Sequence, residues 1–172
     1  AVASVVWIIG IALMLGYGIV SFITLRFKVR AAIRGEKNVY FCDEVDSPFI
    51  LGVIRPRIYV PSGMSGEALE HVLAHERSHL RRGDHLWKPV GFALLSLYWF
   101  NPLLWVAYAL LCRDIEAACD EKVIKTMDTA AKKSYSEALL SCSLPRRMVA
   151  ACPLAFGEVG VKARIKSVLH YK

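Results

Sequence analysis

Residues 75–79 read HERSH, an H-E-x-x-H pattern within residues 66–82, whose apolar spacing predicts a single helix. Positions four residues apart on a helix share one face, about one turn apart. The imidazoles of His75 and His79 can therefore bind one zinc ion, and Glu76 can act on a nearby water molecule as a general base. The pattern predicts the zinc-binding helix of a metallopeptidase.

Both ends of this helix carry sequence signals. Ser65 is a favourable N-cap residue, and Gly83 suits the left-handed position that follows a last helical turn. The same five-residue pattern also arises by chance on polar helix surfaces that carry two histidines. A catalytic zinc site further needs a third protein ligand, which the rest of the chain must supply.

His71 lies on the same helical stripe as the two motif histidines. Eight helical residues separate His71 from His79 by about 12 Å along the axis, whereas Zn–N bonds measure about 2 Å. His71 cannot join both histidines on one ion. We therefore expect it to support a ligand from outside the ligand set or to lie at the surface.

Glu116 is the best candidate for the third ligand. Glu116 and Asp120 are four residues apart, so they share a helix face; Glu116 would bind zinc, and Asp120 would accept the N–H of a ligating histidine. The competing interpretation is a solvated acidic face. Asp84 has two interpretations as well, since it can orient part of the site or cap the helix that follows Gly83.

Two uncharged apolar runs raise the hydrophobic share to 55% and the mean hydropathy to +0.39. Residues 1–25 are long enough to span a bilayer, which takes about 20 residues, although a buried core helix would look similar. Asn101 and Pro102 interrupt the second run and favour a helix start. The apolar helices predicted at residues 87–112 can associate with a membrane or be buried against protein, and the sequence leaves both open.

Five basic residues follow the first run directly: Arg26, Lys28, Arg30, Arg34 and Lys37. Basic residues flank the cytoplasmic end of a spanning helix. We therefore expect residues 26–172 to form a zinc peptidase domain that faces the cytoplasm. Anionic membrane lipids account for the net charge of +7, so direct binding of nucleic acid is not expected.

A small β-sheet is predicted between the basic patch and the motif helix. Residues 47–54 and 57–61 favour a hairpin around Arg55 and Pro56, and residues 38–42 favour another strand. The expected fold is mostly α, with a small antiparallel sheet and a transmembrane helix. The hairpin either covers the helices or binds substrate peptide by strand addition, through Ile50, Leu51, Gly52, Val53 and Ile54.

After the motif helix, further helices are predicted at residues 84–100, 102–127, 132–143 and 159–171. The cysteine count is odd and the sequence has no C-x-x-C pattern, which in a reducing cytoplasm favours small buried residues over disulfides. These cysteines are Cys42, Cys112, Cys119, Cys142 and Cys152.

Several short motifs occur together: SPF at 47–49 with Gly52, RPRIYVP at 55–61, HERSHLRRGD at 75–84, WFNP at 99–102, RDIE at 113–116 with ACD at 118–120, PLAFG at 153–157 and RI at 164–165. With them the chain resembles the membrane metallopeptidases of the β-lactam-sensor transducer, or antirepressor, family (BlaR/MecR-type). The resemblance implies a gluzincin-type site with His75, His79 and Glu116 as zinc ligands and Glu76 as the general base.

The resemblance also implies a role in antibiotic resistance, in a multi-pass protein of the cell membrane whose active site faces the cytoplasm. Its substrate would be a cytoplasmic transcriptional repressor, the transducer itself, or both. The chain does not begin with Met, and we expect it to be a fragment of a longer polypeptide. The activating signal, an extracellular sensor domain and a homodimer remain open.

Two other functions are compatible with the sequence. A non-catalytic membrane signalling module could carry a structural zinc site, but such a site has no need of the base Glu76. A membrane quality-control zinc protease would share the chemistry and differ in its regulation. The domain downstream in the full gene and a neighbouring repressor gene would discriminate between them.

Overall fold

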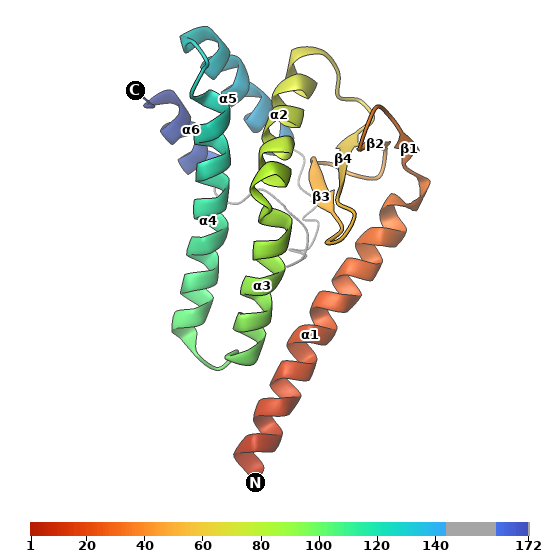
Figure 1. Ribbon diagram of the computed structural model, residues 1–172, viewed down its shortest axis with the longest axis vertical. Helices are drawn as coiled ribbons and strands as arrows, with labels where there is room; N and C mark the ends of the chain where they lie inside the picture. The colour runs from red at the N-terminus through yellow and green to blue at the C-terminus, as the bar shows by residue number, and fades with distance from the viewer. Residues whose placement is uncertain (144–160, 172) are drawn as a thin grey trace.

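The computed structural model describes residues 1–143 and 161–171, so that Cys152 and the motif at 153–157 lie outside the described residues. The elements are α1 (Val2–Lys28), the short 3-10 helix η1 (Val29–Ala31), β1 (Ile33–Arg34), β2 (Val39–Cys42), β3 (Phe49–Leu51), β4 (Arg57–Pro61), α2 (Gly66–Arg82), α3 (Asp84–Leu97), α4 (Pro102–Ile124), α5 (Thr129–Ser143) and α6 (Val161–Leu169). A small sheet lies at one side of the molecule, next to α1 and α2 (Figure 1).

The predicted helix boundaries are largely confirmed. Helix α2 ends at Gly83, whose backbone φ of 72° is left-handed, as the sequence predicts. The side chain of Asn101 accepts a hydrogen bond from the backbone N–H of Leu103 at 3.0 Å and so caps α4. Ser65 occupies the N-cap position of α2, but its side chain makes no capping hydrogen bond.

The sheet is mixed, which corrects the prediction of an antiparallel sheet. The strand order is β1-β2-β4-β3, with β2 and β4 parallel and the other neighbours antiparallel. The predicted hairpin of β3 and β4 is present, but β4 also inserts beside β2. Local sequence patterns specify strands and turns but not this long-range pairing, and the two-residue strand β1 was missed for the same reason.

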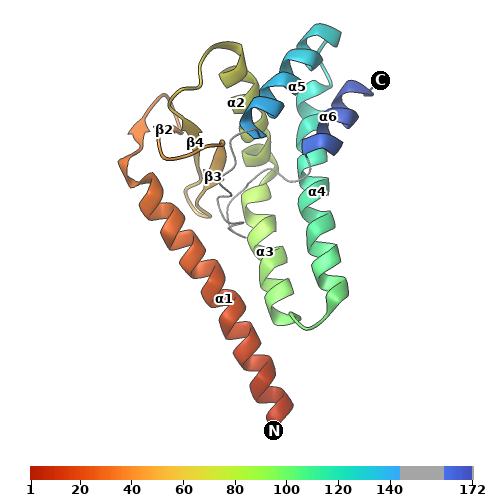
Figure 2. The same ribbon diagram turned by 180° about the vertical axis from the view of Figure 1, so that it is seen from behind.

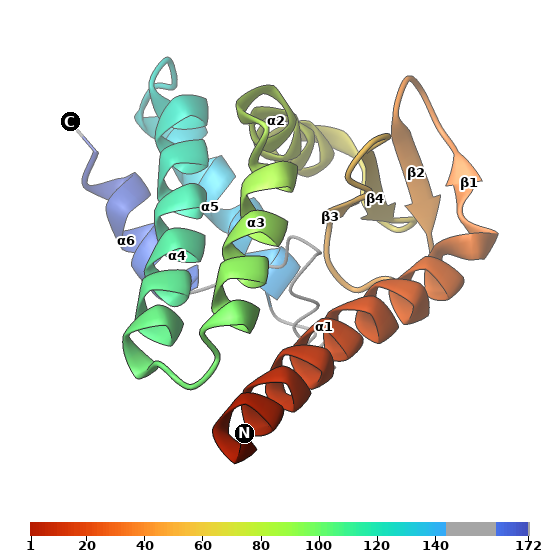
Figure 3. The same ribbon diagram turned by 60° about the horizontal axis from the view of Figure 1, so that its bottom comes forward.

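The two faces of the sheet pack against different helices. Phe49, Leu51 and Tyr59 lie on one face with Leu25 near the end of α1, whereas Ile50 lies on the other face with residues of α2. This alternation follows the two-residue period of a strand. The sheet therefore lies between α1 and α2, and its edge strand β3 is the strand nearest to α2 and α3 (Figures 1 and 3).

Helices α3 and α4 form an antiparallel hairpin whose tip lies beside the first part of α1 (Figures 1 and 3). Trp7 Nε1 donates to the carbonyl of Leu97 at 2.8 Å, and Trp99 Nε1 donates to the carbonyl of Trp7 at 3.2 Å. Many apolar side chains of the hairpin are exposed, including those of Leu94, Phe100, Leu103 and Val106. Within the described residues, α1 is the only helix long and apolar enough to cross a membrane.

Helix α6 packs against the carboxyl-terminal half of α4, and α5 packs against α6 and α2 (Figures 1 and 2). Ile124, Tyr135, Leu139 and Val168 form the buried cluster that joins α4, α5 and α6. The packing brings Tyr135 from α5 and a buried arginine from α6 toward α2. In the same described part of the chain, the cysteines are buried, as predicted: Cys42, Cys112, Cys119 and Cys142.

Candidate metal centre

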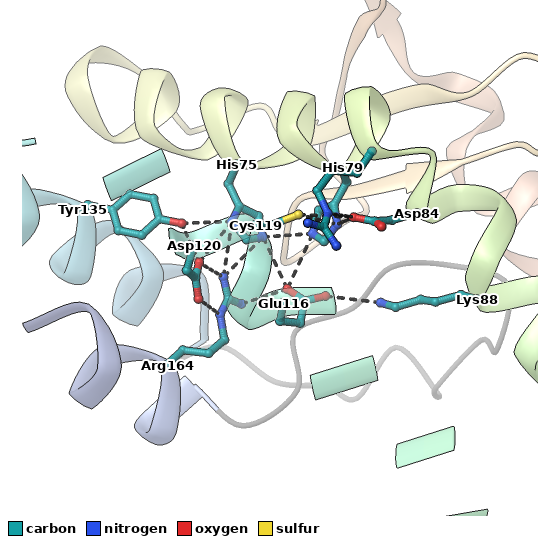
Figure 4. A network of polar contacts seen from close by, with 10 residues as sticks. His75, His79, Asp84, Lys88, Glu116, Cys119, Asp120, Tyr135 and Arg164 are labelled. Carbon is teal, nitrogen blue, oxygen red and sulfur yellow. Dashed lines mark hydrogen bonds and ion pairs between the residues drawn. The ribbon is translucent and has the colours of Figure 1, made fainter. Parts of the chain in front are cut away.

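Three side chains from helices α2 and α4 converge at one point (Figure 4). His75 Nε2 lies 3.0 Å from His79 Nε2 and 3.3 Å from Glu116 Oε2. His79 Nε2 lies 3.6 Å from the same oxygen. All three side chains are almost completely buried. Because α2 and α4 pack side by side, residues 41 positions apart meet at one point.

The outer ring nitrogen of His75 contacts Tyr135, Asp120 and Arg164. His75 Nδ1 lies 2.9 Å from the hydroxyl of Tyr135 and 3.2 Å from Asp120 Oδ1. The Tyr135 hydroxyl in turn donates to Asp120 at 2.7 Å. These contacts orient the imidazole so that Nε2 faces His79 and Glu116, and they place Asp120 beside the outer nitrogen of His75.

The outer nitrogen of His79 is held in a similar way by different groups. His79 Nδ1 lies 3.1 Å from Asp84 Oδ2 and 3.1 Å from the thiol of Cys119. Asp84 also accepts a hydrogen bond from Arg82 Nε at 3.0 Å. The alternative that Asp84 caps α3 is wrong, because Gly83 occupies the N-cap position and Asp84 points at His79.

Arg164 closes the site from α6. Its guanidinium binds both oxygens of Asp120 at 2.7 Å, in the two-point geometry that makes arginine–carboxylate pairs strong. Arg164 Nη1 also lies 3.3 Å from Glu116 Oε2. One arginine therefore links Asp120 to Glu116.

Lys88 of α3 approaches the remaining oxygen of Glu116. Its Nζ donates to Oε1 at 3.2 Å, and the side chain is only 3% exposed. The sequence gives little indication of Lys88, Arg164 and Tyr135, since isolated basic and aromatic residues usually lie at surfaces or in cores. The one available signal was that Lys88 follows Asp84 by four residues on one helix face.

The pKa values of the two histidines are raised by their carboxylate and thiol neighbours. Burial alone would lower the pKa of His79, but hydrogen bonds to Asp84, Cys119 and Glu116 outweigh burial and raise it to about 12. Burial likewise opposes a raised pKa at His75, and hydrogen bonds to Asp120 and Glu116 outweigh it. The surroundings of His75 and His79 therefore favour their positively charged forms.

The pKa values of the carboxyl groups are lowered by the same network. Burial would raise the pKa of Asp120, but hydrogen bonds from Arg164 and His75 lower it to about 2. At Glu116, burial is outweighed by hydrogen bonds to both histidines and by the charge of Lys88, so its pKa lies well below the ordinary value. Both groups are ionised at neutral pH.

The donor set fits a divalent cation. Three ligands at about 2.1 Å around one tetrahedral zinc ion lie roughly 3.4 Å apart, close to the separations of 3.0, 3.3 and 3.6 Å between these atoms. In the described part of the chain, four ionisable carboxyl groups are buried beside two buried cations, Lys88 and Arg164. With neutral histidines, the excess of two negative charges matches one divalent ion.

Other residues singled out in the sequence lie outside this donor set. His71 is buried, 3.2 Å from the Ser134 hydroxyl, and its ring meets the edge of Tyr135, which itself contacts His75. Glu76 is buried on α2 between the two motif histidines.

The five residues predicted to bind substrate divide into a buried and an exposed part. The side chains of Ile50 and Leu51 are buried on β3, whereas those of Val53 and Ile54 are exposed in the following turn. Gly52 lies between them with a φ of 111°, which a side chain would strain.

Comparisons with known proteins identify the family of the chain. Residues 1–168 match the family described as BlaR1 peptidase M56. The chain is 30% identical over 194 aligned positions to the regulatory protein BlaR1 of Bacillus licheniformis, which covers 97% of this chain and 32% of that protein. It is 25% identical over 142 positions to the methicillin resistance mecR1 protein of Staphylococcus aureus, covering 78% of this chain and 24% of the relative.

The chain thus spans about a quarter to a third of the length of these relatives. The family match extends through α2, α4 and most of α6, which carry His75, Glu116 and Arg164. The resemblance seen in the sequence motifs is confirmed. This chain belongs to the BlaR1 peptidase M56 family.

Proposed function

We propose that the chain is the catalytic part of a membrane-bound zinc metalloendopeptidase. The observation that carries the proposal is the convergence of His75 Nε2, His79 Nε2 and Glu116 Oε2 within 3.6 Å of one another. A catalytic zinc site has three protein ligands and an open position. These three residues would hold the ion.

A bound zinc ion would supply a Lewis acid for the scissile carbonyl and lower the pKa of water to near neutrality. Glu76, next to His75 on α2, would take the proton from the attacking water and give it to the leaving amine. Asp120 and Asp84 would keep the two imidazoles oriented through their outer nitrogens, which is the usual role of such carboxylates. Glu76 also favours catalysis over a structural site, which needs no base.

The substrate is proposed to be a protein, either the polypeptide itself or a cytoplasmic repressor. Strand β3 is an edge strand within the described sheet, and it lies near α2. An extended peptide could pair with its backbone, while Val53 and Ile54 offer exposed apolar side chains. The buried side chains of Ile50 and Leu51 would leave only their backbone for this role.

The membrane location rests on two exposed apolar surfaces. Helix α1 carries no charged residue before Arg26, and basic residues follow, so its carboxyl end would face the cytoplasm. The α3–α4 hairpin has no charged residue between Lys88 and Arg113, and its tip contacts α1 at Trp7. We place the hairpin in the bilayer beside α1, with the metal centre at its cytoplasmic end.

The test compares bound metal and self-cleavage in the wild-type chain and in His75→Ala, Glu76→Gln and Glu116→Ala variants in detergent or lipid. His75→Ala and Glu116→Ala should lose zinc and cleavage together. Glu76→Gln should keep zinc and lose cleavage. Cleavage that persists in zinc-loaded Glu76→Gln would rule out the proposed base, and zinc content unaffected by Glu116→Ala would rule out the third ligand.

A further inference from the structure

Lys88 is an unusual neighbour for a metal ligand. Lysine is almost never fully buried unless it is paired, because its ammonium group loses hydration. Here the side chain is 3% exposed, and its Nζ lies 3.2 Å from Glu116 Oε1, which is itself buried. Solubility, which explains most surface lysines, does not explain a lysine buried at this position.

The two oxygens of Glu116 have different surroundings (Figure 4). Oε2 faces the histidines, 3.3 Å from His75 Nε2 and 3.6 Å from His79 Nε2, and also lies 3.3 Å from Arg164 Nη1. Oε1 points the other way, toward Lys88. The ammonium group of Lys88 thus binds Oε1, the oxygen that points away from the histidines. The other oxygen, Oε2, faces the donor set.

Helix α3 supports both halves of the donor set. Asp84 and Lys88 are four residues apart and share a face of α3. Asp84 contacts His79 of α2, and Lys88 contacts Glu116 of α4. The first turns of α3 therefore contact one candidate ligand from each neighbouring helix.

We propose that Lys88 is a positioning residue that makes Glu116 a one-oxygen ligand. A carboxylate can bind a metal through one oxygen or both. By retaining Oε1, Lys88 would prevent Glu116 from taking a second coordination position, which a catalytic site keeps for water and substrate. The inference rests on the proposed function, since it takes Glu116 as a metal ligand.

A role in charge neutralisation alone predicts a different result. If Lys88 only balanced the buried charge of Glu116, removing it would reduce the repulsion of the metal and leave the coordination number unchanged. Positioning instead predicts that Oε1 turns toward the metal once its donor is gone. The coordination number, read from a spectrum, therefore separates the two roles.

The experiment uses Lys88→Met and Lys88→Gln in the whole chain loaded with cobalt(II). The two new side chains have equal length, but only Gln can donate to Oε1. Four-coordinate cobalt(II) absorbs visible light more strongly than five- or six-coordinate cobalt(II). The intensity of the absorption therefore reports the coordination number. Lys88→Met should retain the metal with at least wild-type affinity and show weaker absorption, whereas Lys88→Gln should restore the wild-type spectrum.

Ser96→Ala is the matched control. Ser96 is buried on the same helix, where its hydroxyl donates to the carbonyl of Phe92 at 2.8 Å, away from Glu116. The control should leave the cobalt spectrum and the zinc affinity unchanged. An unchanged spectrum in Lys88→Met would overturn the inference, and so would unfolding of both Lys88 variants by circular dichroism. Metal uptake that is equal in the wild-type chain and in Glu116→Ala would instead overturn the proposed function.

Discussion

The two halves of α4 place their side chains in opposite ways. In the first half, Leu103 and Val106 are 72% and 57% exposed. In the second half, Glu116 and Asp120 are 2% and 3% exposed. A helix at the surface of a soluble protein buries its apolar residues and exposes its charged ones. The inversion indicates that the two halves have different surroundings.

Helix α3 repeats the contrast. Its first turns bury Asp84 and Lys88, whereas Leu94 near its end is about half exposed. The hairpin thus has a charged end enclosed by protein and an apolar end suited to lipid. The stability of the charged end depends on ion-pair partners from other helices. The stability of the apolar end depends on whether lipid or water surrounds it. Each half of this contrast can be tested separately.

The largest expected effect is at the enclosed end. Arg164→Met would leave Asp120 buried without its two-point partner, and breaking a buried pair in this way costs about 3–5 kcal/mol of unfolding free energy. Arg113→Met is the control, since Arg113 and Asp114 form an exposed pair at 3.7 Å, whose loss costs roughly 0–1 kcal/mol. Denaturant unfolding of the metal-free chain measures both, and equal losses would contradict the contrast.

The enclosed end should also respond to pH. Burial would lower the pKa of His79, but its hydrogen bonds raise it to about 12, so metal-free His79 is protonated at neutral pH. Zinc needs neutral imidazole, so binding releases at least one proton and affinity rises with pH. Each released proton gives about tenfold per pH unit. Competition with a chelator between about pH 6 and 8 measures the slope, and a flat profile would contradict it.

The apolar end should be sensitive to charge only in lipid. Leu103→Glu places a carboxylate at the hairpin, and in lipid nanodiscs we expect it to lower the unfolding free energy by about 2 kcal/mol. Ile33→Glu is the control, because Ile33 on β1 is also 72% exposed and a surface change there should stay within about 0.5 kcal/mol. Similar small losses at both positions would show that the hairpin does not face lipid.

The smallest expected effect tests the turn that joins the hairpin helices. Asn101→Ala removes the cap of α4 and should cost about 1 kcal/mol. Ser65→Ala changes the corresponding position of α2, where no capping hydrogen bond is present, and should cost less than about 0.5 kcal/mol. Thermal unfolding compares the two, and an equal loss would mean that the Asn101 contact contributes nothing.

Much of the centre could be predicted from sequence, because its strongest signals are local. The spacing of His75 and His79 on one helix, and of Glu116 and Asp120 on another, follows from helical periodicity. The structure places Asp120 and Asp84 against the outer nitrogens of the two histidines. The convergence of α2 and α4 was inferred from chemistry, since neither segment specifies the packing.

The parts that were missed depend on long-range contacts. Arg164 meets Asp120 across 44 residues, and Tyr135 meets His75 across 60. A buried cation also has no local signature, because Lys88 in sequence looks like the charged boundary of an apolar run. The parallel pairing of β2 with β4 was missed for the same reason, as the strands between which β4 inserts are set by packing on both faces of the sheet.

Gly83 is the single residue between α2 and α3. A tilt of α3 about this residue would move the far tip of the hairpin more than it moves the first turns. Helix α3 extends for about 21 Å at 1.5 Å per residue, whereas Lys88 lies only about 7 Å from the joint. A tilt of about 10° about Gly83 would move the far tip by about 4 Å and Lys88 by about 1 Å. Displacements in the apolar end would thus reach the charged end reduced about threefold, at the scale on which a hydrogen bond to Glu116 is kept or lost.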